Sequence, residues 1–270
     1  MDNPRLRRAV QEKPDKHWSL EQISGWLRRE FPDDDAMNVC HETICQAIYV
    51  QSRGQLKRDI EAKLRSGRAS RRPRSAADGR KPRFRDPMVM IGERPAEVED
   101  RAVPGHWEGD LITGAANKSA IGALVERTTR FTMLLHLPDG HGAEQVQDAI
   151  VRKMARLPEL MLNSLTRDQG SELACHKKIG AALDMQVYFR DPHSPWQRGT
   201  NENTNGLLHQ YFPKGTDLSV YPEGHLDAVA EELNDRPRKT PGFMKPSELF
   251  LKLIDESEDA AYVSGCCIRR

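Results

Sequence analysis

The chain has 270 residues, and its 41 Lys and Arg almost balance its 40 Asp and Glu, giving a formal net charge of +1. A chain of this length can bury one large core or two modest ones. No stretch approaches the ~20 apolar residues needed to cross a bilayer, and the N-terminus lacks the apolar segment of a secretory signal. The sequence therefore excludes a membrane-spanning protein and predicts a cytoplasmic one.

The cysteines predict no structural site. They are odd in number and no two of them form a Cys-x-x-Cys pair, so neither a disulfide framework nor a zinc ribbon is indicated. We expect all five to be reduced: Cys40, Cys45, Cys175, Cys266 and Cys267.

The near-zero net charge conceals an uneven distribution. Residues 1–105 carry 22 Lys and Arg against 17 Asp and Glu, whereas the remainder carries 19 against 23. The basic excess lies in Arg65–Arg85, where Asp78 is the single acid. Such a run repels itself and is expected to be extended. It fits a solvated linker and a DNA-phosphate-neutralising arm about equally well, and the arm would use Arg71, Arg72 and Arg74.

The first 52 residues predict three short helices. Asn3 followed by a proline predicts a helix through about residue 11, and Ser19 caps a second helix over 20–30. A polar break precedes a third, over about 41–50. Two short helices separated by a break, with polar groups near the start of the second of them, have the outline of a helix-turn-helix. The outer face of the third helix offers candidate DNA contacts at His41, Thr43 and Gln46.

From residue 103 onward strands and helices alternate, after a proline-spaced stretch at 87–104. The predicted order β-β-β-α-β-α-β-α is an antiparallel meander followed by crossovers, which makes a mixed α/β sheet covered by helices. The expected strands are 106–114, 119–129, 131–137, 162–168 and 185–190, and the expected helices are 143–157, 172–183, 201–211 and 226–234, before a proline-rich end.

Three acids stand out in this second part. Asp110 lies inside the first strand among apolar neighbours, and burial of an unpaired carboxylate costs several kcal/mol, so we expect a cation or metal beside it. Asp168 ends the fourth strand, where Gly170 allows a sharp turn. Glu202 lies in the first turn of a helix, where an acid also favours the helix dipole and is often simply exposed.

Converging on one site, these three carboxylates would suit Mg²⁺ or Mn²⁺. Two such ions roughly 3.5–4 Å apart clamp the attacking and leaving oxygens of an in-line phosphoryl transfer.

Longer motifs around these acids resemble a known family. The segments GHWEGDLI, TRDQGSE and DPHSPWQRGTNENTNGLLHQYFPKGTDL closely resemble the catalytic core of bacterial transposases of the insertion-sequence-30 family. The 33 residues between Asp168 and Glu202 match that family's spacing. The front segments WSLEQISGWLRREFPDD and HETICQAIYVQSRG resemble its DNA-binding part, and NDRPRKTPGFMKPSELF resembles the close of its catalytic domain.

The resemblance implies a ribonuclease-H-like integrase core in which Asp110, Asp168 and Glu202 are catalytic and hold two Mg²⁺, with Mn²⁺ as an alternative. It implies cleavage of double-stranded DNA at the terminal inverted repeats of a mobile element and strand transfer, by at least a dimer at the nucleoid. Arg198 and Lys214 flank the Glu202 helix as candidate phosphate contacts. The expected organisation is a DNA-binding domain (1–52), a basic arm (53–102), the catalytic core (103–254) and a tail (255–270).

Departures from the family leave an alternative open. Family members usually carry a further N-terminal helix-turn-helix, so a truncated, non-catalytic copy that acts as a repressor is the second interpretation. A nuclease on the same fold is a third, whereas a tyrosine recombinase and a zinc protease lack their required residues. Cys40 stands where the family commonly has Ser, and because Cys is a poor N-cap, we expect the third helix to lose ~1 kcal/mol.

Overall fold

The computed structural model describes residues 3–13, 16–51, 88–94, 102–169, 175–191, 199–240 and 242–266, with side chains at all of these except 48–51, 199–202 and 257–266. The chain divides into two compact units, one of residues 1–80 with 235–245 and one of residues 81–234 with 246–270. None of the described helices is long and apolar enough to cross a membrane.

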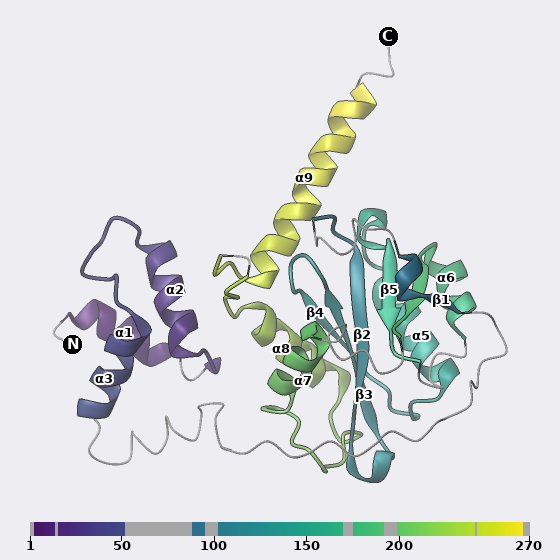
Figure 1. Cartoon of the computed structure of the whole chain (residues 1–270), viewed down its shortest axis with the longest axis horizontal. Helices are drawn as coiled ribbons and strands as arrows, with labels where there is room; N and C mark the ends of the chain where they lie inside the picture. Colours follow the sequence, from purple (N-terminus) through teal and green to yellow (C-terminus); the bar gives the residue numbers. More distant parts are fainter. Residues whose placement is uncertain are drawn as a thin grey trace. The chain divides into compact units, whose positions relative to one another are not determined.

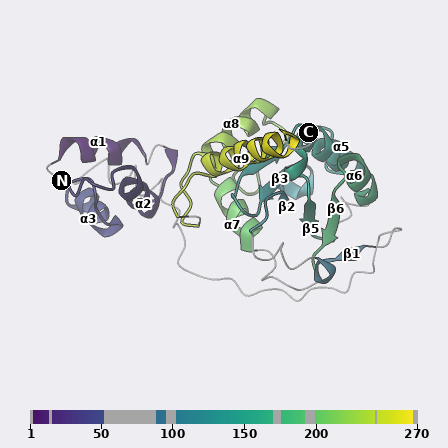
Figure 2. The same ribbon diagram turned by 90° about the horizontal axis from the view of Figure 1, so that it is seen from above.

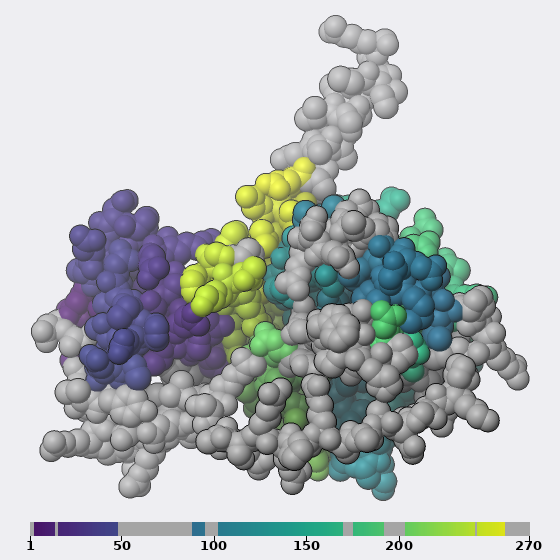
Figure 3. Space-filling view, viewed as in Figure 1, coloured from purple at the N-terminus to yellow at the C-terminus, as the bar shows by residue number. Residues whose placement is uncertain are grey.

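Three helices form the body of the first unit, coloured purple in Figure 3. The Asn3 side chain accepts hydrogen bonds from the backbone N–H groups of Arg5 and Leu6, and Ser19 forms a capping box with Gln22, so both predicted caps are confirmed. Apolar side chains from all three helices pack together in one core. The helices are α1 (Pro4–Glu12), α2 (Leu20–Glu30) and α3 (His41–Gln51).

Cys40 lies at the N-cap of the third helix and contacts its first turn. The Sγ atom of Cys40 accepts a hydrogen bond from the backbone N–H of Thr43 at 3.4 Å and lies 3.1 Å from the Thr43 hydroxyl. These two contacts lower the pKa of the exposed Cys40 thiol below its usual value. Sulfur thus occupies the place of a serine oxygen, and the expected loss of ~1 kcal/mol relative to serine stays a prediction.

A late segment of the chain, residues 235–245, belongs to this first unit. The Gln22 side-chain amide donates to the carbonyl of Pro237 at 2.9 Å, and Lys239 pairs with Glu21 at 2.7 Å. The Phe243 ring lies against Gly25, where an added Cβ would approach within 2.3 Å of the ring. Gly25 is therefore required for this contact.

The second unit is built on a six-stranded sheet in the order β1-β6-β5-β2-β3-β4. The meander β2-β3-β4 is antiparallel, and β2, β5 and β6 are parallel neighbours. The predicted mixed sheet is confirmed, and the five strands other than β1 have the ribonuclease-H-like order. The strands are β1 (Val89–Met90), β2 (His106–Thr113), β3 (Ala120–Glu126), β4 (Thr132–Leu135), β5 (Ser164–Arg167) and β6 (Gln186–Phe189).

Helices cover both faces of the sheet, as Figures 1 and 2 show. One apolar core joins α5, α6 and the start of α9 to the face that carries Trp107 and Leu165. The other joins α7 and α8 to the face that carries Ile112 and Ile121. The helices are α5 (Ala143–Met154), α6 (His176–Leu183), α7 (Gly199–Leu208), α8 (Glu223–Asn234) and α9 (Pro246–Cys266).

Two elements differ from the predictions. The stretch expected to be irregular after residue 87 contains β1, which pairs in parallel with β6. The expected proline-rich end contains α9, a helix of 21 residues that begins at Pro246, a residue suited to a first helical position. Phe250 anchors α9 by stacking on Phe131, with ring centroids 4.0 Å apart.

Several ends also shift by a few residues. The helix expected through Leu157 ends at Met154, the one expected through Tyr211 ends at Leu208, and the predicted strands lose one to three residues at their ends.

Candidate active site

Alternate residues of the parallel strands bring one set of polar side chains to a single face of the sheet. Side chains alternate between faces along a strand. In the register Glu108 faces Thr166, and Thr166 faces Tyr188. Two residues further on, Asp110, Asp168 and Arg190 therefore share this face. It is the face that α7 and α8 cover over β2 and β3.

Gly109 separates the two acids of β2 for a packing reason. On the opposite face of the sheet, the buried Arg167 side chain runs along β2, and a Cβ at Gly109 would lie 2.8 Å from its Cδ atom. The motif Trp-Glu-Gly-Asp thus places two carboxylates on one face and leaves room for a guanidinium stem on the other.

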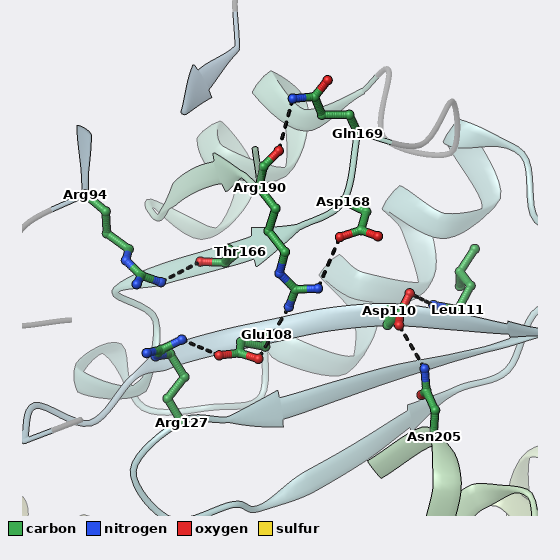
Figure 4. Close-up of polar contacts among 10 residues, drawn as sticks. All are labelled: Arg94, Glu108, Asp110, Leu111, Arg127, Thr166, Asp168, Gln169, Arg190 and Asn205. Atoms are coloured by element: carbon green, nitrogen blue, oxygen red, sulfur yellow. Dashed lines mark hydrogen bonds and ion pairs between the residues drawn. The ribbon is translucent and has the colours of Figure 1, made fainter. Parts of the chain in front are cut away.

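Asp110 is partly buried in β2 and is held by neutral donors. Its Oδ1 atom accepts from the backbone N–H of Leu111 at 2.9 Å, and its Oδ2 atom accepts from the side-chain amide of Asn205 on α7 at 2.8 Å (Figure 4). We expected a cationic partner for Asp110, but among the described residues its hydrogen-bond partners are these two neutral groups. These two hydrogen bonds orient the carboxylate without bringing a positive charge to it.

Asp168 follows β5 directly and has a cationic neighbour. An Nη1 N–H of Arg190 donates to its Oδ1 atom at 3.2 Å. The Asp168 side chain is 27% exposed, whereas that of Arg190 is 2% exposed. Gln169 fixes the other side of this corner by donating from its amide to the backbone carbonyl of Arg190 at 3.0 Å.

Glu108 is a site residue that the sequence analysis missed. Its buried carboxylate accepts from Arg127 through one oxygen and from Arg190, at 3.3 Å, through the other. Arg190 consequently bridges Glu108 and Asp168 (Figure 4). The available signal was its position two residues before Asp110, because residues i and i+2 of a strand share a face.

His106 lies on the same face at the start of β2. Its Nδ1 atom is 2.7 Å from the hydroxyl of Ser164. Burial, together with the nearby Arg127 and Arg94 guanidinium groups, lowers the pKa of His106 to about 4. The imidazole is therefore neutral at pH 7.

The third predicted acid, Glu202, lies in the first half of α7, and its side chain is outside the described residues. It precedes Asn205 by three positions, so the two residues share a face of α7. Among the side chains that the structure does describe, no three His, Cys, Asp or Glu are grouped as metal ligands.

The predicted DNA contacts fall into two groups. The structure describes four of them, three on α3 and one after the Glu202 helix, and all four side chains are exposed: His41, Thr43, Gln46 and Lys214. The rest lie outside the described residues: Arg71, Arg72, Arg74 and Arg198.

Residues 100–195 match the family described as the integrase core domain. The catalytic core domain of BIV integrase is 21% identical, and the match covers 58% of this chain and 98% of that one, with a TM-score of 0.42.

Two relatives match most of the chain. The transposase for insertion sequence element IS1086 of Cupriavidus metallidurans is 50% identical over 91% of this chain and 72% of its own length. The transposase InsI for insertion sequence element IS30C of Escherichia coli is 43% identical over 91% of this chain and 64% of its own length. The chain thus spans about two thirds of these relatives. It belongs to the insertion-sequence-30 family of transposases, polynucleotidyl transferases with an integrase core that depend on divalent metal ions.

Proposed function

We propose that the chain cleaves DNA at the terminal inverted repeats of a mobile element and transfers the freed strands, using Asp110, Asp168 and Glu202 as metal-binding catalytic residues. The observation that supports this most is the arrangement of the acids. Asp110 and Asp168 share one face of two neighbouring parallel strands, and α7, which carries Glu202, is tied to Asp110 through Asn205.

The donor set fits a hard divalent cation. Asp110 and Asp168 each lie two positions beyond the paired residues Glu108 and Thr166 and on the same face, so we propose that they share ions. Both are partly exposed, and Asp110 is held by neutral N–H donors alone within the described part of the chain. Carboxylate oxygens are the ligands that Mg²⁺ and Mn²⁺ prefer. We propose two Mg²⁺ at these three acids, with Mn²⁺ as a substitute.

In this proposal the bound ions supply Lewis-acid stabilisation of the attacking and leaving oxygens. The residues of the chain orient the carboxylates: Asn205 fixes that of Asp110, and Arg190 contacts that of Asp168. Water is the first nucleophile and a DNA 3′-hydroxyl is the second, so no covalent bond between protein and DNA is formed.

DNA recognition is proposed for the rest of the chain. The exposed side chains His41, Thr43 and Gln46 present hydrogen-bonding groups on one helix, and Lys214 offers a phosphate contact after the Glu202 helix. Arg198 and the arm residues Arg71, Arg72 and Arg74 are proposed as further phosphate contacts. We propose the functional parts expected from the sequence, 1–52, 53–102, 103–254 and 255–270, although the compact units place 235–245 with the first unit and 81–102 with the second.

Double-stranded element ends and target DNA are the proposed partners. Joining of two ends requires two active sites, so we propose at least a dimer, located at the nucleoid.

The experiment is a cleavage assay on labelled duplexes that carry the element's inverted repeat, with Mg²⁺, Mn²⁺ or EDTA. We expect metal-dependent, strand-specific nicks at the repeat boundary and joined products. Asp110→Asn, Asp168→Asn and Glu202→Gln should each abolish both products while retaining DNA binding. Asp139→Asn, an exposed acid between β4 and α5, is the matched control and should cleave normally.

Any of three results would overturn the proposal. Cleavage that survives in the three acid variants would remove these residues from the chemistry. Tight binding of the repeat without cleavage under either metal would favour the repressor interpretation, whereas cleavage without joining would favour a nuclease.

A further inference from the structure

We propose that Arg190 is a positioning residue for catalysis, which holds the Asp168 carboxylate in its metal-binding orientation through a buried anchor formed by Glu108 and Arg127. This inference deepens the proposed function and rests on it. It assigns a role to three residues that the expected set of acids and DNA contacts does not include.

The first step in the argument is the burial of the anchor. The side chains of Glu108 and Arg190 are 3% and 2% exposed, and that of Arg127 is 9% exposed. A carboxylate at this depth costs several kcal/mol unless it is paired. Glu108 meets this requirement with one arginine on each oxygen, so both of its oxygens are already occupied. Glu108 is therefore an anchor for cations rather than a further metal ligand.

The second step is the geometry of the bridge. Arg190 uses Nη2 toward Glu108 at 3.3 Å and Nη1 toward Asp168 at 3.2 Å. A guanidinium is planar and rigid, so fixing one of its nitrogens fixes the direction of the other. The backbone of Arg190 is also held, since its N–H donates to the carbonyl of Arg167 at 2.9 Å and its carbonyl accepts from Gln169.

The third step is the charge count. Arg127 and Arg190 bring two positive charges to the single negative charge of Glu108, and the Asp168 carboxylate pairs with the other side of the Arg190 guanidinium. Asp168 is the partly exposed member of the four, so it is the end of the chain of contacts that can reach an ion. Since the bridge holds Oδ1 of Asp168, it fixes the direction of the whole carboxylate, including Oδ2.

Two roles for Arg190 predict opposite effects of mutation. If Arg190 only contributes charge, Arg190→Lys should behave like the wild type, and Arg190→Met should bind metal more tightly because a nearby cation is lost. If Arg190 positions Asp168, both variants should bind metal more weakly, since neither can contact Glu108 and Asp168 in the same fixed geometry. Loss of a residue that orients a metal ligand typically lowers affinity or activity by about 10- to 100-fold.

The test is a titration of the full chain with Mn²⁺ alone, followed by electron paramagnetic resonance of the free ion, beside the cleavage assay. Asp168→Asn defines the loss of a ligand. Lys153→Met is the matched control, because it removes a cation that pairs with Asp227 elsewhere in the same unit. We expect a rise of about tenfold in the Mn²⁺ dissociation constant for both Arg190 variants, a fall in kcat, and wild-type values for the control.

A second variant covers the case in which the Arg190 variants do not fold, judged by circular dichroism. Glu108→Gln keeps the shape of the anchor but removes its charge, and it should weaken Mn²⁺ binding with Arg190 still present. Suppose that the wild type binds Mn²⁺ and cleaves DNA. Wild-type Mn²⁺ affinity in Glu108→Gln, or in folded Arg190→Lys, would then overturn this inference and leave the proposed function intact. A wild type that neither binds Mn²⁺ nor cleaves would overturn the proposed function and this inference together.

Discussion

The edge of the sheet at β4 depends on one side chain, Asn234 at the end of α8. Its Oδ1 atom accepts from the backbone N–H of Thr132, and its Nδ2 donates to the backbone carbonyl of the same residue, both at 2.8 Å. The Asn234 amide thus hydrogen-bonds both backbone groups of Thr132, as a neighbouring strand would. Both residues are almost fully buried. Asn234→Ala removes both partners at once.

The magnitude follows from the two backbone groups left behind. A buried donor or acceptor without a partner costs about 1–3 kcal/mol, so two such groups would cost about 2–6 kcal/mol. Water entering at the sheet edge recovers part of this, so we expect about 2–4 kcal/mol. This corresponds to a fall of about 30- to 1,000-fold in the protection of β4 amides, at 1.4 kcal/mol per factor of ten.

The assay is hydrogen exchange followed by mass spectrometry on the full chain, reading peptides that cover β4 and α8. Glu231→Ala is the matched control, because Glu231 is an exposed residue of the same helix, and exposed substitutions usually change stability by less than about 0.5 kcal/mol. Peptides from α1–α3 should not change in either variant. A loss of protection in β4 below about threefold in Asn234→Ala would refute the reasoning, since that is close to 0.6 kcal/mol.

Three further predictions concern other parts of the chain. Gly25→Ala should destabilise the first unit, because the new Cβ would overlap the Phe243 ring; thermal unfolding should show a lower Tm that Phe243→Leu partly restores, and an unchanged Tm would contradict the contact. His106 has a folded pKa of about 4, below its unfolded value of about 6.5, so its stabilising effect is present above pH 6.5 and is lost as the pH falls toward 4. The free energy of unfolding of the wild type minus that of His106→Gln should therefore fall by up to about 3 kcal/mol between pH 7 and pH 4, and a pH-independent difference would show that the imidazole titrates normally. DNA binding should weaken steeply with salt if the Arg65–Arg85 run neutralises phosphates, and measured dissociation constants that vary little with salt would remove that run from the interface.

The strands of the second unit were found in the sequence because they are short, nearly continuous apolar runs bounded by polar residues and glycine, which is the pattern of a sheet covered on both faces. Asp110 and Asp168 were found for the same reason, since an acid at the middle or end of an apolar strand departs from the pattern. β1 was missed because two residues between prolines carry no period, and its pairing with β6 depends on a strand about 100 residues away.

The Arg190 bridge could not be predicted for a related reason. Arg190 precedes an aspartate at the end of a strand, which is typical of a surface cation. Its partners Glu108 and Asp168 come from two other strands, so the contact exists only once the order β6-β5-β2 is known. α9 was missed although Pro246 and Glu248 are suitable first-turn residues, because the acidic sequence after Ile254 lacks an apolar face.

The strand order also determines when the site can exist. β2 is the first long strand made, and its partner on the Asp168 side, β5, follows only after the meander and α5 have been synthesised. Until residues 164–167 emerge from the ribosome, one edge of β2 has no partner strand, and Asp110 stands without Asp168. Closing this long-range parallel pair costs chain entropy that local hairpins do not. An interrupted chain therefore exposes an open sheet edge, which is prone to association with other strands, and it lacks any assembled set of catalytic acids.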